Sequence, residues 1–429
     1  MGAFDKVIGY EHIKNELLQI CDMINNRDAY EKLGAKLPQG VLMEGDPGLG
    51  KTLMASCFIE ECGLKSYTIR RTKGKEAFLE CIRETFQKAK DNAPAVILLD
   101  DLDKFANEDN SHQDAEEYVA VQAGIDTIKR CNVLVIATVN DIEKLPDSLI
   151  RPGRFDKRIV VNCPTDEDAA NLIRHYLSDK QVSDKINVED ISKTMQHVSC
   201  AALEVILNQA AIIAASKRQE TIEMEDFVDS ILRMQYDSDE KNNKVPEEEM
   251  RKTAIHEAGH MVVAEVLMPE SIGLVSIRQN DMESIGGFVR KCKKFNRRQE
   301  IMVALAGKVA TELYDSETCA SGCQSDLERA TRILTDGIKY SGTNGLGFIR
   351  TDYITSDVFQ ARVELVAHAE LEQYMFKVRD LLIKNRDFLE KAANRLFEKE
   401  TLLFSDIREI RESVEIVKPG GGITWLCSE

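Results

Sequence analysis

The chain has 429 residues, of which 43% are hydrophobic and 30% are charged, a balance typical of a soluble globular protein with two or three domains. Its formal net charge of −17 at pH 7 argues against a nucleic-acid partner, and no apolar run approaches the roughly 18 residues of a membrane helix. The first residues, MGAFDKVIGY, do not form a secretion signal, and the eleven cysteines include no C-x-x-C pair, so we expect reduced thiols in a cytoplasmic protein.

Residues 1–165 alternate apolar strands with amphipathic helices, which predicts an α/β domain with a parallel sheet covered on both faces. After the first predicted strand, 40–44, comes a complete G-x-x-x-x-G-K-T phosphate loop, Gly45-Asp46-Pro47-Gly48-Leu49-Gly50-Lys51-Thr52. Its backbone N–H groups and the next helix N-terminus would bind the phosphates of a nucleoside triphosphate. Lys51 would contact the β- and γ-phosphates, and Thr52 would bind Mg²⁺.

Polar residues follow the next two predicted strands, 95–100 and 133–138. Asp100 stands where an ATPase of this type carries its magnesium-binding acid. Asp101 stands where a glutamate usually orients the attacking water, and its side chain is one methylene shorter. Asn140 suits contact with the γ-phosphate or the water. The alternatives are a solvated acid at Asp101 and a turn-capping residue at Asn140.

Two arginines lie close together in the stretch RPGRFD, residues 151–156. Arg151 and Arg154 either reach into a neighbouring subunit as arginine fingers or form surface ion pairs, and the spacing alone does not decide. Residues 166–236 contain almost no strand signal and predict a small helical lid domain. The polar stretch 237–250, which contains a proline, predicts a linker.

Residues 251–415 predict a mostly helical domain with one hairpin-like interruption at 273–292, and residues 416–429 a flexible tail. The segment His256-Glu257-Ala258-Gly259-His260 is a complete H-E-x-x-H. On a helix the two histidines share a face and can bind one zinc ion, while Glu257 can act as the general base. The alternative is a pair of solvated histidines on an amphipathic helix.

A catalytic zinc ion needs a third protein ligand and an open fourth position. The residues alone leave several downstream acids open for this role: Glu312, Asp315, Glu317, Asp326 and Glu328.

Residues 7–235 resemble the ATPase module of the AAA+ superfamily, and the runs YEKLGAKLPQGVLM (30–43) and LIRPGRFD (149–156) are similar to its FtsH branch. This resemblance implies a homohexamer that binds ATP with Mg²⁺ between subunits. It favours arginine fingers at Arg151 and Arg154, and it implies that Ile8 and Gly9 lie near the adenine.

The resemblance continues to about residue 412. The run SGCQSDLERAT (321–331) is similar to the FtsH segment whose aspartate is the third metal ligand, which implies that role for Asp326. The run ALAGKVATE (304–312) resembles another helix of the family, so we expect Glu312 to be structural. The whole implies an ATP-dependent zinc metalloprotease that binds Zn²⁺ and feeds protein or unfolded polypeptide substrates to its peptidase site.

The chain departs from the family in three places. FtsH proteins normally begin with two membrane helices, whereas this chain begins at the ATPase, so it is either naturally soluble or trimmed. The aromatic motif that grips substrate is replaced by the short basic stretch RRTKGKEA (70–77), and the register of nearby Phe78 favours helix packing. We therefore expect weak unfolding of stable proteins, a preference for unfolded or acidic-tagged substrates and, because of Asp101, slow ATP turnover.

Two other functions stay open on the sequence. One is a remodelling ATPase, or chaperone, whose peptidase is vestigial. The other is a peptidase in which ATP binding mainly organises the ring.

Overall fold

The described part of the computed structural model covers most of the chain. It comprises residues 2–71, 74–106, 115–129, 131–236, 246–278, 287–315, 323–341 and 356–419. The chain divides into two compact units, the first made of Met1–Lys180 with Gln196–Asn208 and the second of Gln181–Met195 with Gln209–Glu429. The predicted lid is shared between these units, and the boundaries predicted near residues 165, 236, 250 and 415 remain predictions.

The first unit is built on a five-stranded parallel sheet with strand order β2-β3-β4-β1-β5. Its strands are β1 (Gly40–Glu44), β2 (Lys65–Ile69), β3 (Ala95–Leu99), β4 (Val133–Val139) and β5 (Lys157–Val160). Every residue of β1, β3 and β4 is buried, which accounts for their continuous apolar sequences. The carboxyl ends of these three strands meet at one edge of the sheet, where ligands bind in such folds.

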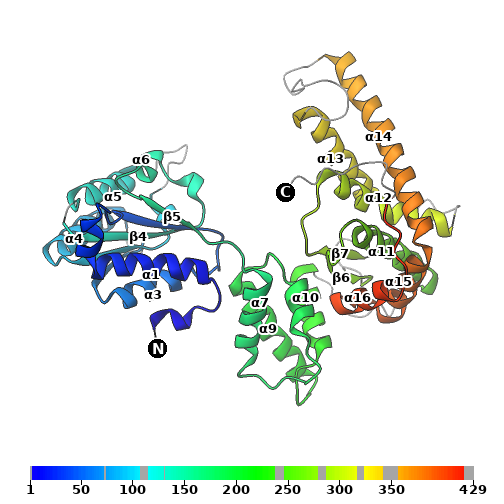
Figure 1. The fold of residues 1–429 in the computed structure, drawn as a ribbon, viewed down its shortest axis with the longest axis horizontal. Helices are drawn as coiled ribbons and strands as arrows, with labels where there is room; N and C mark the ends of the chain where they lie inside the picture. Colours follow the sequence, from blue (N-terminus) through cyan, green and yellow to red (C-terminus); the bar gives the residue numbers. More distant parts are fainter. Residues whose placement is uncertain are drawn as a thin grey trace. The chain divides into compact units, whose positions relative to one another are not determined.

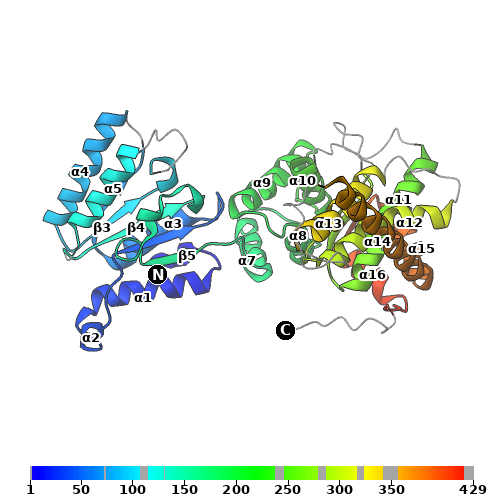
Figure 2. The same cartoon turned by 90° about the horizontal axis from the view of Figure 1, so that it is seen from above.

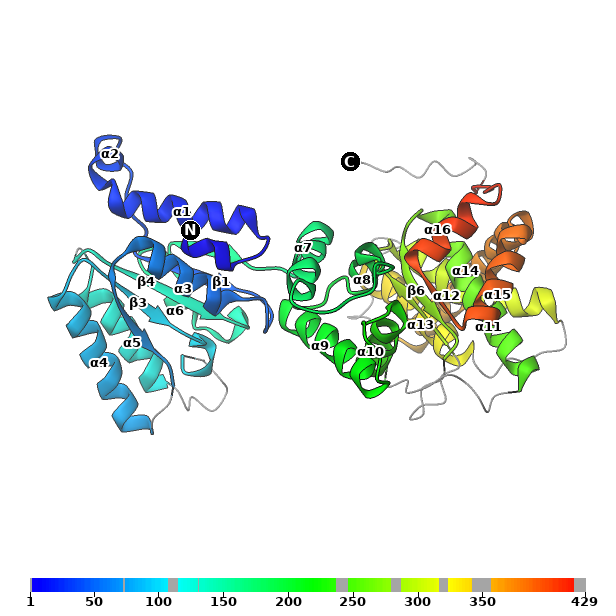
Figure 3. The same cartoon turned by 90° about the horizontal axis from the view of Figure 1, so that it is seen from below.

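Helices cover both faces of this sheet (Figure 3). α1 (Glu11–Asn25) and α3 (Lys51–Cys62) lie on one face, and α4 (Lys75–Asp91) and α5 (Ala115–Thr127) lie on the other. The other helical elements of this unit are η1 (Ala3–Lys6), α2 (Arg27–Lys32), η2 (Leu102–Lys104), η3 (Ile142–Lys144), α6 (Asp147–Ile150) and α7 (Asp166–Leu177). Phe78 is buried and packs edge-to-face on Phe105, as its register predicted.

The second unit is mostly helical, and its long helix α11 (Glu247–Leu267) packs against α12 (Arg297–Tyr314) and α15 (Arg386–Lys399) (Figures 1 and 2). A side chain at Gly259 would approach the Cβ of Ala310 to 2.5 Å, so this glycine sets the close spacing of α11 and α12. The other helices of this unit are α8 (Val188–Thr194), α10 (Met224–Tyr236), α13 (Gln324–Ser341), α14 (Asp357–Lys384) and α16 (Phe404–Glu412), while α9 (Cys200–Ser216) begins in the first unit.

A small antiparallel sheet completes the second unit. β6 (Ile272–Ser276) pairs with β7 (Phe288–Lys291), as the alternation at 273–292 predicted, although residues 279–286 lie outside the described residues. β6 also pairs with β8 (Thr401–Leu403), which the sequence did not predict because three residues are too few to show an alternation.

These findings confirm the predicted fold class, an α/β domain with a parallel sheet followed by a mostly helical region. Among the described residues, no helix combines the length and the apolar character needed to span a bilayer.

Candidate nucleotide and metal sites

The phosphate loop joins β1 to the N-terminus of α3, and its backbone requires glycine. Gly45, Gly48 and Gly50 have φ angles of 148°, 79° and 83°, which other residues rarely adopt. The N-cap of α3, Gly50, has no side chain to bond the first N–H groups of the helix, so these groups can bind an anion. The carbonyl of Gly48 accepts a hydrogen bond from the backbone N–H of Ala201, in the first turn of α9, at 3.0 Å.

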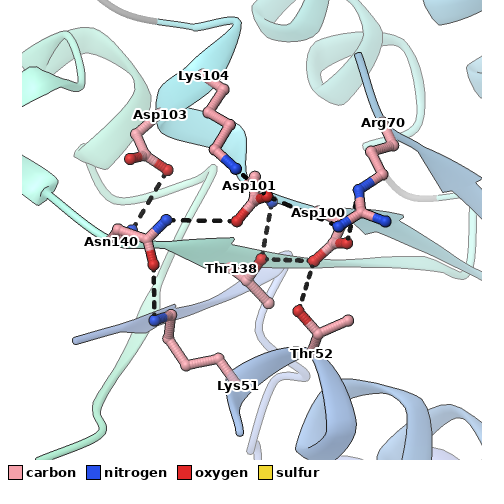
Figure 4. A network of polar contacts seen from close by, with 9 residues as sticks. All are labelled: Lys51, Thr52, Arg70, Asp100, Asp101, Asp103, Lys104, Thr138 and Asn140. Atoms are coloured by element: carbon pink, nitrogen blue, oxygen red, sulfur yellow. Dashed lines mark hydrogen bonds and ion pairs between the residues drawn. The ribbon is translucent and has the colours of Figure 1, made fainter. Parts of the chain in front are cut away.

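The ammonium group of Lys51 is buried against this loop. It donates hydrogen bonds to the carbonyl oxygens of Gly45 and Asp46 at 2.6 and 2.7 Å, and to Oδ1 of Asn140 at 2.9 Å. Burial lowers the pKa of Lys51, and nearby carboxylates, led by that of Asp101, offset part of this effect. Lys51 therefore links the loop to Asn140, and Figure 4 shows its contact with Asn140.

The buried carboxylate of Asp100 joins three elements of the sheet edge. Its Oδ1 accepts hydrogen bonds from the hydroxyls of Thr52 on α3 and Thr138 on β4, both at 2.9 Å (Figure 4). The hydroxyl of Thr138 in turn accepts the backbone N–H of Asp101 at 2.9 Å. Thr138 was not predicted as a site residue, although a polar residue at the end of the apolar run 133–138 was a usable signal.

Asp101 adopts a left-handed conformation with φ of 55°. Its Oδ1 accepts a hydrogen bond from the side-chain amide of Asn140 at 3.3 Å, and its Oδ2 lies 2.6 Å from Nζ of Lys104 and 3.8 Å from Nη2 of Arg70. Burial opposes ionisation, but these three partners outweigh it and lower the pKa of Asp101. The side chain is therefore an ionised acceptor whose two oxygens are already engaged.

The two candidate finger arginines differ in their contacts. Arg154 pairs with Asp126 at 2.8 Å and donates to the carbonyl of Ser148, and this pairing helps to lower the pKa of Asp126 to about 2. Arg151 is exposed, and within the described ranges its side chain forms no ion pair. Arg151 is thus the more accessible of the two.

Ile8 and Gly9 line a cavity of about 540 Å³ at the N-terminal end of the first unit. Gly9 has φ of 73°, and a side chain there would collide with Asp168. A second cavity of about 580 Å³ contains Gly45 and Asp46, and Thr165 lines both cavities. Ile8 and Gly9 therefore lie one cavity away from the phosphate loop.

The H-E-x-x-H segment lies on α11, which begins directly after Pro246. Asp326, in the first turn of α13, brings its Oδ2 to 3.1 Å from Nε2 of both His256 and His260, and the two Nε2 atoms are 3.0 Å apart. Nδ1 of His260 lies 2.6 Å from the carbonyl of Val303 and donates to it, which leaves Nε2 as a lone-pair donor.

These three side chains form the one candidate metal cluster found in the part of the chain that the structure describes. Burial opposes a charged imidazole, but Asp326, Cys323 and Glu257 together outweigh it and raise the pKa of His256 to about 10. Against the effect of its own burial, the imidazoles hold the pKa of Asp326 well below its usual range. The position attracts positive charge, and two nitrogens with one oxygen suit a tetrahedral zinc ion with an open fourth position.

Among the other acids that the sequence left open, the three that the structure describes do not join the histidine cluster. Glu312 pairs with Lys308 and Arg379, both at 2.7 Å, in keeping with a structural role. Asp315 lies 3.7 Å from Lys252, and Glu328 is exposed. Glu317 lies outside the described residues.

A glycine on α12 lies directly against the two imidazoles. A Cβ on Gly307 of α12 would lie 2.5 Å from Nε2 of His256 and closer still to Nε2 of His260. Glu257 is buried beside the histidines, its burial raises its pKa, and a Cβ on Gly287 would lie 2.8 Å from its Oε1. A side chain at Gly307 would therefore collide with both histidine ligand atoms, so the cluster requires glycine at this position.

Family models match both parts of the chain. The model of the ATPase family associated with various cellular activities (AAA) matches residues 41–163, and that of peptidase family M41 matches residues 243–410. The chain is 29% identical to ATP-dependent zinc metalloprotease FtsH of Caldicellulosiruptor bescii, over 95% of this chain and 72% of the relative. It is 29% identical to FtsH 1 of Thermomicrobium roseum, over 97% and 70%, and 30% identical to FtsH 2 of Sphaerobacter thermophilus, over 93% and 65%.

We predict that Gly307→Ala abolishes metal binding, because the added methyl group would lie within 2.5 Å of both Nε2 atoms and displace these ligand atoms. Metal content after zinc loading should fall at least about tenfold, while ATP hydrolysis should persist. Lys308→Ala, one residue along the same helix, is the matched control and should keep its metal. Normal zinc content in Gly307→Ala protein would show that the ions bind elsewhere.

Proposed function

The chain belongs to the FtsH family, in which an AAA ATPase domain precedes a family M41 peptidase domain, and from this premise we propose how it works as an ATP-dependent zinc metalloprotease. One observation carries the proposal: the same chain holds a phosphate loop bonded to a buried acid and a His-His-Asp cluster beside a buried glutamate. ATP hydrolysis would deliver polypeptide, and the cluster would cleave it.

At the nucleotide site we assign the phosphates to the loop backbone and Lys51, and Mg²⁺ to Thr52 and Asp100. Asp101 and Asn140 would orient the attacking water, a role supported by their mutual hydrogen bond. Ile8 and Gly9 would face the adenine, since their cavity adjoins that of the loop.

At the peptidase site we assign the zinc ion to His256, His260 and Asp326. A bound zinc ion polarises the scissile carbonyl and makes an attacking water more acidic. Glu257 would take the proton from that water and pass it to the leaving amine. Its buried position beside the two histidines supports this assignment.

We further propose a homohexamer with ATP bound between subunits, in which Arg151, assisted by Arg154, reaches the neighbouring nucleotide. The exposure of Arg151 supports this assignment. Protein or unfolded polypeptide substrates and a cytoplasmic location complete the proposal. In it, residues 1–165 form the ATPase, 166–236 the lid, 237–250 the linker, 251–415 the peptidase and 416–429 the tail.

The decisive test is casein degradation by the purified protein with ATP, a non-hydrolysable analogue or no nucleotide, each with and without a zinc chelator. We expect cleavage only with ATP and metal, and none from Glu257→Gln protein, which keeps its metal ligands but lacks the base. Cleavage with the non-hydrolysable analogue would instead indicate a peptidase in which ATP binding only organises the ring. ATP hydrolysis without any cleavage would indicate a remodelling ATPase.

We expect Asp101→Glu to raise the ATP turnover number by about three- to tenfold, because the longer side chain restores the usual reach to the attacking water. The measurement is steady-state phosphate release at saturating ATP. The control is Asp141→Glu, the same lengthening at a half-exposed acid that caps η3. An Asp101→Glu variant no faster than the parent would contradict this account of slow turnover.

Stable folds should resist this protein. Phe78 is buried and cannot grip a substrate, and the preceding stretch has charged side chains but no aromatic one. Such side chains hold a polypeptide weakly when it is pulled. We expect an acidic-tagged stable domain to be degraded at least about tenfold more slowly than a destabilised variant of the same domain. Gel-based degradation assays at matched concentrations measure this ratio, and equal rates would refute the prediction.

A further inference from the structure

Arg70 occupies a position beside both acids of the nucleotide site. It is the first residue after β2. The backbone N–H of Asp100 donates to the carbonyl of Ile69 at 3.0 Å, so the segments that follow β2 and β3 run side by side there. Nε of Arg70 lies 3.4 Å from Oδ2 of Asp100, and its Nη2 lies 3.8 Å from Oδ2 of Asp101 (Figure 4). Its side chain is 61% exposed, so the guanidinium can turn to another partner in solvent, while the buried carboxylate of Asp100 keeps the hydroxyls of Thr52 and Thr138 as donors.

The contact with Asp100 places Arg70 in competition with a metal ion for the same carboxylate. Oδ1 of Asp100 is engaged by Thr52 and Thr138, and Arg70 faces Oδ2. A guanidinium at this distance lowers the negative potential that a cation at Thr52 and Asp100 would experience. Removing the guanidinium therefore strengthens the attraction of the site for Mg²⁺.

In the basic stretch that begins with Arg70, each cationic side chain that the structure describes pairs with a carboxylate. Arg71 lies 3.6 Å from the buried carboxylate of Glu117, and Lys75 lies 3.5 Å from Glu116. An acidic polypeptide presents the same group in a flexible form. Of these cations, only Arg70 also contacts an acid of the nucleotide site.

We propose that Arg70 is a positioning residue that exchanges between Asp100 and a carboxylate of an acidic polypeptide substrate, and that its departure strengthens Mg²⁺ binding at the nucleotide site. This inference rests on the proposed function, in which the stretch 70–77 meets the substrate. It names acidic segments as the substrate class and gives their binding a direct effect on the ATPase.

The first test is the Mg²⁺ dependence of binding of a fluorescent non-hydrolysable ATP analogue to the full chain, which requires neither ATP hydrolysis nor proteolysis. In Arg70→Gln, the Mg²⁺ concentration for half-maximal binding should fall about three- to fivefold, the size expected for a mostly exposed ion pair. Arg70→Lys keeps the charge and should stay near the parent. Lys75→Gln removes a charge from the same stretch whose partner, Glu116, is 67% exposed, and it should also stay near the parent. Equal shifts in both glutamine variants would overturn the proposal.

The second test adds a polyglutamate peptide to the same measurement. It should lower the Mg²⁺ requirement of the parent and leave that of Arg70→Gln unchanged, and polylysine should have no effect on either. The Arg70→Gln protein also corrects for Mg²⁺ bound by the peptide itself. A polyglutamate effect of equal size in both proteins, or none in the parent, would overturn the proposal, while casein cleavage, measured separately, would still decide the proposed function.

Discussion

An ionised carboxylate withdrawn from water must be surrounded by cations or hydrogen-bond donors, because leaving it unpaired costs several kcal/mol. Each candidate site is built around one such group. Asp100 unites the hydroxyls of Thr52 and Thr138, so the phosphate-loop helix and two strands meet at one oxygen. Asp326 does the same for His256 and His260, and thereby fixes α13 against α11. The same demand for compensation shapes both sites, although their chemistry is unrelated.

The peptidase site also depends on how closely two helices approach. Gly259 on α11 lets the helices meet at Ala310, and Gly307 on α12 faces the two imidazoles. The first glycine brings α12 near enough for the carbonyl of Val303 to orient His260. The second has no side chain that would collide with the two Nε2 atoms at this short distance. A side chain at Gly259 would push the two helices apart, and a side chain at Gly307 would collide with the histidine ligands.

Sequence motifs predicted the parts of the sites that are contiguous in the chain. The phosphate loop is one turn that leads into a helix, and H-E-x-x-H lies on a single helix, so the spacing of their residues alone gives their geometry. Asp326 lies 66 residues beyond His260, and only the resemblance to FtsH selected it among the five open acids. Arg70 and Thr138 were missed because their relation to Asp100 depends on the register of parallel strands. Lys104 was missed because its contact with Asp101 follows from a short 3-10 turn that has no apolar period.

The hydrogen bond between Ala201 and Gly48 ties the first turn of α9 to the phosphate loop. Any nucleotide that shifts Gly48 must do work on this bond, and by thermodynamic linkage a displacement of α9 must change nucleotide affinity by the same free energy. A displacement of α9 that strains this bond would therefore change the affinity of the loop for nucleotide, and nucleotide binding would in turn favour one position of α9. The phosphate loop is in this sense coupled mechanically to the helix as well as being a ligand site.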